Sequence, residues 1–245
     1  MSVDYNTLKP QANKLLAALP ASDYERLLPH IKYVPLAFNQ IIYKPGEPIT
    51  HVYFPYHSVI SIVTTMQDGS TVEAGLVSSE GMVGIPVILG GDTTTTKAIV
   101  QIGDGATQID TDVLKSEFNR GGALQSLLLR YVQAQCTELG QGLACNRLHT
   151  IEERLARWLL TVTDRLESKD FLLTQEFIAQ MLGVRRSGVT LAASTLNRAG
   201  IISYNRGRIN ILNRGILEDT SCECYQVIKN EFARLLDNSP RDNSE

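Results

Sequence analysis

The sequence predicts an α+β protein in which a strand-rich N-terminal β-roll or jelly roll precedes a long helix and a C-terminal winged helix-turn-helix. Short runs rich in Val, Ile, Thr and Tyr alternate with turn residues from 33 to 110, and helical periodicity follows from 111 to about 166. Many short strands at regular spacing favour an antiparallel roll or barrel over a parallel sheet. We therefore expect a roll at 1–120, a linking helix at 121–149 and the helix-turn-helix domain at 150–245.

The individual strands are predicted from clusters of β-branched and aromatic residues. Glycine, proline and aspartate separate these clusters, and those residues favour tight turns. The predicted strands are residues 40–43, 51–54, 59–65, 71–77, 96–102 and 106–110. Upstream of them, Ser22 and Glu25 have the spacing of a capping box, which predicts a short helix from there to about His30.

The composition is that of an ordinary globular protein. The chain is 43% hydrophobic and 20% charged, and it contains no apolar run of the roughly 20 residues that a spanning helix needs. Its first residues lack the basic flank and apolar core of an export signal, so we expect a cytoplasmic protein that does not contact a membrane. Four cysteines, all beyond residue 135, do not indicate a disulfide framework, and reduced thiols are expected.

A long helix is predicted from about residue 123. Seven of its residues fall at alternating spacings of three and four, which is typical of the seam of a two-stranded coiled coil. These are Leu124, Leu128, Tyr131, Gln135, Glu138, Gly142 and Cys145. Gln135 and Glu138 suit such a seam poorly, so an amphipathic helix packed on its own barrel remains the alternative. Thr150 and Glu153 predict a second capping box, which places a domain boundary near His149.

The helix-turn-helix is predicted from an N-cap, a turn glycine and a small residue at the crossing of two helices. Thr174 is a good N-cap, Gly183 tolerates the positive φ of a helix C-terminus, and Ala179 lies four residues before that glycine. The segment 201–211 then predicts two short strands around a tight turn, which form the wing. The predicted apolar faces of the two helices are Phe177, Ile178, Met181, Leu182, Val184, Val189, Ala192 and Leu196.

Positive charge is concentrated in this part of the chain. Residues 171–215 contain six arginines, no lysine and a single acid, Glu176, so this segment carries +5 while the whole chain carries −3. Such asymmetry indicates double-stranded DNA as a partner, and arginine can bridge O6 and N7 of guanine. Surface arginines on an ordinary three-helix domain are the alternative. The predicted DNA-binding residues are Thr174, Gln175, Arg185, Arg186, Ser187 and Thr190, with Arg206 and Arg208 on the wing for phosphates.

The order of barrel, long helix and winged helix-turn-helix resembles the CRP/FNR family of bacterial transcription regulators. The motifs that carry the resemblance are Leu173-Thr174-Gln175-Glu176 with the turn glycine, and Ile151-Glu152-Glu153-Arg154-Leu155-Ala156 at the hinge. The resemblance covers nearly the whole chain. It implies a homodimer that reads two DNA half-sites about one turn apart, with RNA polymerase as a further partner and a ligand-sensing N-terminal barrel.

The chain departs from the cyclic-nucleotide-binding members of that family at the phosphate cassette. Gly81-Met82-Val83-Gly84 stands where those members have a turn that grips the ribose, and Thr96-Lys97 stands where they have an arginine and a serine. Leu139 occupies a position that contacts the base in the cyclic AMP member. Methionine cannot accept from a ribose hydroxyl, and threonine carries no charge for a phosphate. The predicted effector pocket, formed by Gly81, Met82, Val83, Gly84, Thr96, Lys97 and Leu139, is therefore expected to take a small molecule other than ordinary cyclic AMP, or none.

Other chemistries have weaker signals. An iron-sulfur sensor of this family would need an N-terminal cysteine cluster, which the chain lacks. Cys222 and Cys224 have the spacing of half a metal or redox site, but incidental buried thiols explain them as well, so no metal site is predicted. The histidines are scattered, and a haem ligand among them stays open as an alternative to no cofactor. No catalytic motif is present, so an enzyme is not expected.

The sequence thus predicts a homodimeric, sequence-specific DNA-binding transcription regulator. Leu191, on the outer face of the second helix, predicts an operator different from that of the cyclic AMP member, because leucine can touch a thymine methyl but cannot donate to guanine. Two alternatives remain: a ligand sensor or adaptor that keeps the fold without binding DNA, and a regulator that responds to a true cyclic nucleotide.

Overall fold

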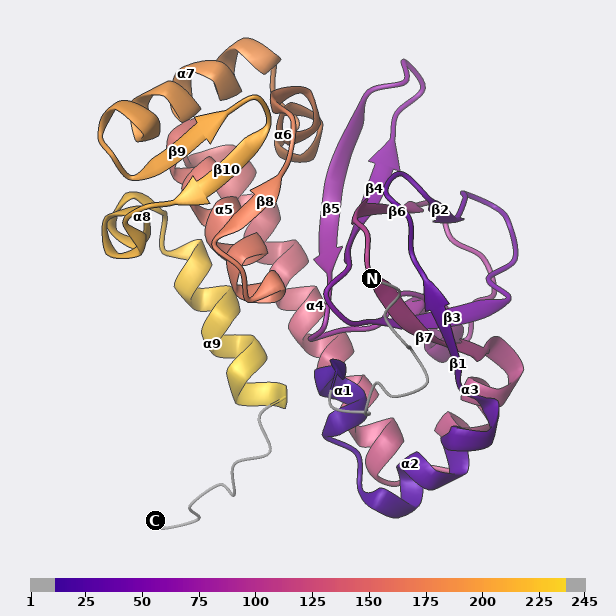
Figure 1. Cartoon of the computed structure of the whole chain (residues 1–245). Helices are drawn as coiled ribbons and strands as arrows, with labels where there is room; N and C mark the ends of the chain where they lie inside the picture. Colours follow the sequence, from indigo (N-terminus) through magenta and orange to yellow (C-terminus); the bar gives the residue numbers. More distant parts are fainter. Residues whose placement is uncertain (1–11, 237–245) are drawn as a thin grey trace.

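The computed structural model describes residues 12–236 and has an N-terminal β-roll, a long diagonal helix and a C-terminal helical domain (Figure 1). Two helical segments precede the roll, α1 (Lys14–Ala17) and α2 (Ala21–Leu27), and α2 continues into the 3-10 turn η3 (Leu28–His30). The capping box predicted at Ser22 and Glu25 is wrong. The N-cap is Pro20, and Ser22 lies inside the first turn, where its side chain cannot cap.

The β-roll consists of two antiparallel sheets. The first has the order β1-β7-β3 and the second the order β2-β6-β4-β5. All six predicted strands are present, with ends within one residue of the predicted ones. The strands are β1 (Lys32–Pro35), β2 (Ile41–Tyr43), β3 (His51–Pro55), β4 (Val59–Thr65), β5 (Thr71–Val77), β6 (Lys97–Ile102) and β7 (Gly105–Asp110). The strand missing from the prediction, β1, lies at a sheet edge and is only half-buried, so its sequence shows little alternation.

Helices close one end and one side of the roll. They are η4 (Ile85–Leu89), α3 (Thr111–Asn119), α4 (Ala123–Leu148) and α5 (Ile151–Leu166). The roll side chains pack with α3 and the first half of α4 into one core that includes Phe54, Ile60 and Leu114. The capping box at the start of α5 is confirmed: Glu153 N donates to the Thr150 hydroxyl, and Thr150 N donates to the Glu153 carboxylate.

The inner face of α4 corrects the predicted dimer seam. Leu124, Leu128, Tyr131 and Gln135 are between 0 and 6% exposed, because the roll of the same chain covers them, while Gly142 is half-buried. These side chains are not available to a second copy of the protein. Four exposed residues of α4 lie one position later in the same repeat, at Leu129, Cys136, Leu139 and Leu143, and Leu148 at the end of the helix is exposed as well. The row that stays exposed is thus adjacent to the predicted one.

The C-terminal domain follows the long helix α4, and after α5 it contains a three-stranded sheet of order β8-β10-β9. Its elements are β8 (Asp170–Leu172), α6 (Gln175–Leu182), α7 (Arg186–Arg198), β9 (Ile202–Asn205), β10 (Arg208–Ile211), α8 (Arg214–Thr220) and α9 (Cys224–Leu236). The short strand β8 was not predicted, and it pairs with β10 behind the wing. The last helix, α9, returns along α4, so both ends of the domain are tied to the long helix (Figure 1).

A buried guanidinium joins the roll, α4 and α5. Arg165 of α5 is paired with Glu138 of α4, Nη2 to Oε2, at 2.9 Å and with Glu80, Nε to Oε1, at 3.0 Å. It also donates to the carbonyl of Leu76 at the end of β5, and the Phe232 ring of α9 lies against its other face. Burial alone would lower the pKa of Arg165, but the two carboxylates outweigh it and raise the pKa, so the side chain stays charged.

A second polar contact ties β5 to α5. Glu73 accepts from the Trp158 indole, at 3.0 Å, and from the Ser61 hydroxyl, at 2.5 Å. Burial raises the pKa of Glu73 from 4.5 to about 7, although both hydrogen bonds favour the charged form. The carboxyl is thus protonated in the folded protein at a pH where the unfolded chain has already lost the proton.

We expect Arg165→Leu to lower the free energy of unfolding by about 3 to 5 kcal/mol, because it leaves the carboxylates of Glu80 and Glu138 buried without a cation. Urea denaturation followed by circular dichroism measures the change. Lys44→Ala is the control, since its ion pair with Glu47 is exposed and should contribute nothing measurable. An Arg165→Leu variant as stable as the Lys44→Ala variant would refute the structural role of the buried cation.

The raised pKa of Glu73 predicts that stability falls as the pH rises. Below about pH 4.5 the carboxyl is protonated in both states, whereas above about pH 7 the folded protein must bury its charge. Between these limits we expect the ionisation of Glu73 to lower the free energy of unfolding by on the order of 1 to 3 kcal/mol. Denaturant midpoints of the wild type and of Glu73→Gln, measured from pH 5 to 8, test this. The amide of the variant still accepts from Trp158 but does not titrate, so the part of the fall in midpoint with pH that Glu73 causes should be absent from the variant. An equal dependence of the midpoint on pH in both proteins contradicts the prediction.

Candidate nucleic-acid interface

The two helices of the predicted helix-turn-helix are present with the predicted caps. The Thr174 hydroxyl accepts from Phe177 N at 3.2 Å at the start of α6, and Gly183 ends that helix with φ 62°. The chain then turns at once, because Val184 N donates to the carbonyl of Ala179 at 3.0 Å. Helix α7 begins three residues after the glycine. This close connection is what sets the angle between the two helices.

A small apolar core holds α7 against α5 and α6. The predicted core residues Ile178, Ala179, Val189 and Leu196 are all buried, and Val189 and Leu196 are fully so. Trp158 of α5 packs against Phe177 with ring centroids 6.2 Å apart. Because α7 is held by its inner face, its outer face is free to contact a partner.

The outer face of α7 carries the predicted reading residues. Arg185, Arg186, Ser187 and Thr190 are all exposed, and Leu191, the apolar residue among them, is 67% exposed. The Thr190 hydroxyl donates to Gln175 Oε1 at 2.7 Å, which joins the first turns of the two helices. Thr190 and Gln175 were both predicted to bind DNA, but the hydrogen bond between them was not predicted, because it joins two different helices.

The wing is a tight hairpin with Arg206 at its tip. Arg206 and Gly207 form the two-residue turn between β9 and β10, and both have positive φ, 49° and 83°, as the turns that suit twisted hairpins require. The Tyr204 hydroxyl donates to the carbonyl of Leu173 at 2.9 Å and so fixes the wing next to the start of α6. Arg208 is less free than predicted, because it pairs with Asp170 of β8 at 2.7 Å.

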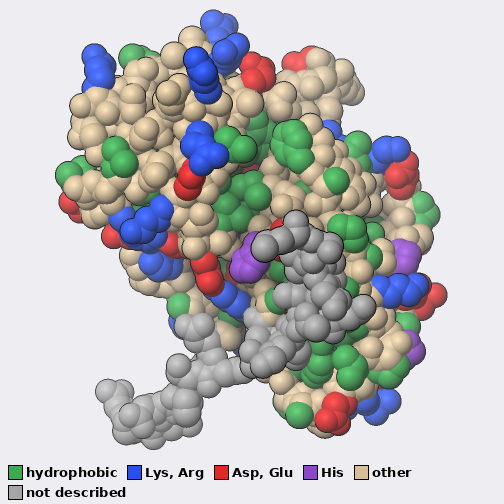
Figure 2. Space-filling model, in the orientation of Figure 1, with side chains coloured by type: hydrophobic (Ala, Val, Ile, Leu, Met, Phe, Trp, Pro, Cys, Tyr) green, Lys and Arg blue, Asp and Glu red, His purple; other side chains and the backbone are tan. Residues whose placement is uncertain are grey.

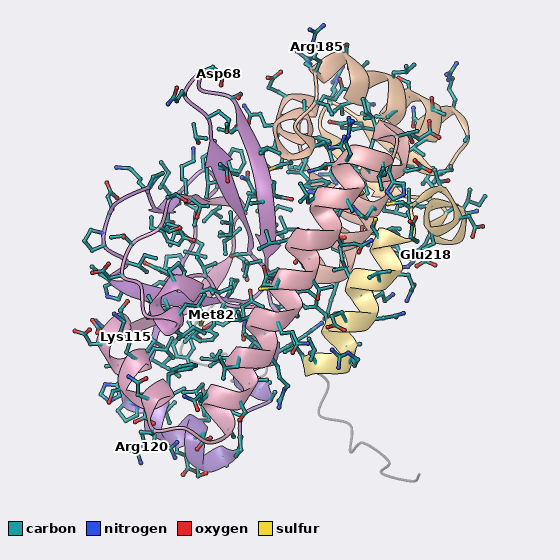
Figure 3. All side chains as sticks on the ribbon, turned by 180° about the vertical axis from the view of Figure 1, so that it is seen from behind. Asp68, Met82, Lys115, Arg120, Arg185 and Glu218 are labelled. Carbon is teal, nitrogen blue, oxygen red and sulfur yellow. The ribbon has the colours of Figure 1, made fainter. Side chains whose placement is uncertain are left out.

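Three arginines of this surface have no acidic partner within residues 12–236. Arg185, Arg186 and Arg206 are exposed and form no ion pair there. Figure 2 shows Lys and Arg side chains gathered at the end of the molecule that α7 covers. Arg185 points outward from that end, far from Arg120 at the opposite end of the roll (Figure 3). The site therefore presents cationic donors to solvent, which suits an anionic polymer.

The predicted effector residues do not come together in one open pocket. Met82 and Val83 are at most 1% exposed and belong to the core of the roll, and Met82 lies beside α4 in Figure 3. The Tyr131 hydroxyl donates to the carbonyl of Met82, and a Cβ on Gly81 would collide with that ring. The chain's own tyrosine thus fills the space at this turn. The prediction that Gly81, Met82, Val83 and Gly84 line an open pocket is wrong, because the chain itself buries all four residues.

The remaining effector residues lie elsewhere. Thr96 and Lys97 are half-buried at the start of β6, and the hydroxyl of Thr96 is 3.0 Å from that of Thr94. Leu139 lines a separate cleft of about 230 Å³ between β5, α4 and α6. A larger cleft, of about 770 Å³, lies between the roll and the wing, where exposed Phe38 and Leu172 face it. Sequence reasoning did not predict this cleft, because its two walls come from different domains.

Comparison with known proteins identifies the fold. A family profile described as the Crp-like helix-turn-helix domain matches residues 153–220. No curated protein matches the chain. Among solved structures, FixK2 from Bradyrhizobium japonicum is similar with a TM-score of 0.69 and 18% identity, over 78% of this chain and 98% of that one.

Two further solved structures agree. A transcriptional regulator of the CRP family from Thermus thermophilus has a TM-score of 0.61 and 19% identity, over 85% of this chain and all of that one. The c-di-GMP responsive global regulator CLP from Xanthomonas campestris has a TM-score of 0.63 and 15% identity, over 78% of this chain and 99% of that one. The chain thus has the fold of the CRP/FNR transcription regulators and carries their helix-turn-helix domain, which confirms the predicted fold class and resemblance. None of the described helices is both long and apolar enough to cross a membrane.

Position 183, in the turn between α6 and α7, is expected to tolerate only glycine. A Cβ there would lie 2.9 Å from Val72 Cγ2 of β5, and φ is positive. We expect Gly183→Ala to lower the free energy of unfolding by about 1 to 3 kcal/mol. Gly200→Ala is the matched control, because Gly200 also has positive φ but faces open space. Thermal and urea denaturation measure both, and equal losses would show that the contact with Val72 has no effect.

Proposed function

We propose that this protein is a homodimeric, sequence-specific DNA-binding transcription regulator. The observation that carries the proposal is the outer face of α7, where Arg185 and Arg186 are exposed and lack acidic partners within the described chain while the inner face is buried. Such a helix can enter the major groove and present its first turn to base edges. RNA polymerase is the partner through which a bound dimer would act on transcription.

Six residues of the surface receive a role in this proposal. Arg186 donates to a guanine edge, and Leu191 contacts a thymine methyl. Gln175 and Thr190, joined by their hydrogen bond, orient the first turn of α7 beside the phosphate backbone. Arg206 at the wing tip binds phosphate, and Arg208 contributes less because Asp170 already neutralises it.

The dimer is proposed to form along the exposed row of α4. Leu129, Cys136 and Leu143 follow one another at intervals of seven, and Leu139 lies between them, as in a coiled-coil seam. Leu143 is 75% exposed in the single chain, so a partner helix can cover it. Two such rows packed together would set the spacing of the two DNA-reading helices.

We propose that any effector of this protein is not ordinary cyclic AMP bound at the turn formed by residues 81–84. The turn that would grip a ribose is filled by Tyr131, and Met82 has no exposed surface. A small molecule that signals to the reader would therefore bind at another place, and the cleft between the roll and the wing adjoins both domains.

Replacing Arg186 and Arg206 should give two different DNA-binding defects. With fluorescence anisotropy on promoter and scrambled DNA, we expect Arg186→Ala to lose about 1 to 3 kcal/mol of discrimination at one base pair. Arg206→Ala should weaken binding to all sequences and reduce the log-log salt slope by about 1. Arg120→Ala removes the same charge from the far end of the roll and should change neither.

The wild-type protein provides the decisive comparison. A salt slope near zero, or equal affinity for promoter and scrambled DNA, would refute the regulator proposal and favour a sensor or adaptor that does not bind DNA. Unchanged binding in both arginine variants would keep DNA binding but refute the assigned residues.

The dimer seam is tested by Leu143→Glu. A carboxylate buried within the interface should raise the dimer Kd by at least about 30-fold, which corresponds to a loss of about 2 kcal/mol. Sedimentation velocity over a concentration series measures this. Leu89→Glu is the control, because Leu89 is 60% exposed on the roll, outside the proposed seam. An undiminished dimer in Leu143→Glu would place the interface elsewhere.

A further inference from the structure

Three cysteines and a histidine that DNA binding does not use meet where α4 ends. Cys145 lies in the last turn of α4 and His149 is its C-cap, while Cys222 lies between α8 and α9 and Cys224 is the first residue of α9. The four side chains offer three sulfur atoms and one ring nitrogen, all within 4.8 Å of one another. Residues more than 70 positions apart are thus brought to one point.

The spacing of these atoms fits a single tetrahedral metal ion. Cys145 Sγ is 3.5 Å from Cys222 Sγ, and Cys224 Sγ is 3.5 Å from His149 Nδ1. A zinc ion bonded to sulfur at about 2.3 Å and to nitrogen at about 2.0 Å holds its ligand atoms roughly 3.5 to 3.8 Å apart. An iron-sulfur cluster does not fit as well, because ligand atoms bound to different irons of a cluster lie farther apart than these four, which are all within 4.8 Å of one another.

The surroundings orient these groups as ligands. His149 Nε2 is 3.2 Å from the carboxylate of Glu223, so Nε2 carries the hydrogen and Nδ1 turns its lone pair toward the sulfur atoms. A carboxylate behind a histidine is the usual outer partner of a metal-bound imidazole. Gln141 Nε2 donates to Cys224 Sγ at 3.3 Å, which holds that sulfur in place within the cluster.

Burial and charge also suit a bound ion. The three sulfur-bearing residues are at most 5% exposed and form a small core of their own. Zinc with three thiolates carries one net negative charge, and two guanidiniums lie close by: Arg157 interacts with Cys145, and Arg154 with Cys145 and Cys222. A disulfide between Cys145 and Cys222 would use only two of the four groups and would leave the arrangement of Cys224, His149 and Glu223 without a cause.

We propose that Cys145, His149, Cys222 and Cys224 bind one zinc ion per chain in a closed, structural site. Four protein ligands leave no position for water or substrate, so the ion acts by cross-linking. It fastens the start of α9 to the joint between α4 and α5, where the long helix meets the DNA-reading domain (Figure 1). This inference does not depend on DNA binding.

The metal content of the full-length protein tests the proposal. After expression with added zinc and desalting under reducing conditions, mass spectrometry of the metal should find one zinc per chain. The protein stripped of metal and titrated with Co²⁺ should show the intense ligand-field bands of tetrahedral cobalt together with a thiolate-to-metal charge-transfer band. Adding zinc at a hundredfold excess over its Kd should raise the Tm by roughly 5 to 10 °C.

Matched variants separate this site from adventitious binding. Cys222→Ser and Cys224→Ser should lose the metal, whereas Cys136→Ser should keep it, because Cys136 is exposed and outside the cluster. Glu223→Gln keeps all four ligands but should raise the metal Kd by about 10- to 100-fold, and it reports on the site even where a cysteine variant fails to fold. Zinc well below one per chain, an octahedral cobalt spectrum, or equal affinity in Glu223→Gln and wild type would overturn the proposal.

Discussion

The arrangement of this protein depends on the burial of one charged side chain. Arg165 is 7% exposed and must find anionic partners inside the molecule, since an unpaired buried charge would cost several kcal/mol. Its partners, Glu80 after β5 and Glu138 on α4, come from the two segments against which α5 packs. The roll, the long helix and the first helix of the C-terminal domain can satisfy this cation only in one mutual position. The bond between Trp158 and Glu73 strengthens the same joint.

The candidate DNA surface extends from that joint. Trp158 lies in the middle of α5 and packs on Phe177 of α6, and α6 in turn carries the glycine turn that leads to α7. The inner faces of these helices are apolar, so Arg185 and Arg186 lie on the outer face, where neither forms an ion pair within the described chain. A rigid inner side and a free cationic outer side are what a base-reading helix needs. The zinc proposed at the end of α4 would fix the other edge of the same domain.

Much of this fold could be predicted because its signals are local. The strand ends agree to within one residue since glycine and proline mark the turns, and the caps at Thr150 and Thr174 agree since each involves residues three apart. Two edge elements, β1 and β8, escaped prediction because short, half-exposed strands have no clear alternation. Ser22 failed as a cap because Pro20, two residues earlier, already starts the helix.

The long helix shows where local reasoning ends. Two adjacent rows of α4 share the predicted heptad spacing, and only packing against the roll decides which one stays exposed. The turn at residues 81–84 is a second example. Its residue types argue against cyclic AMP from the sequence alone, but Tyr131, which fills the space there, comes from a helix about 50 positions away and is known only from the structure. The cysteines at 222 and 224 likewise indicated only half a site until the fold added Cys145 and His149.

The amino-acid sequence by itself determined the order of domains, the caps and turns, the charge of α7 and the family that the chain resembles, because all of these depend on neighbours within a few residues. Only the tertiary structure decided which face of α4 is covered, which charges are paired and which thiols meet. Those outcomes are set by contacts between segments distant in the chain, and a periodic pattern or a pair of cysteines carries no information about what will be packed against it.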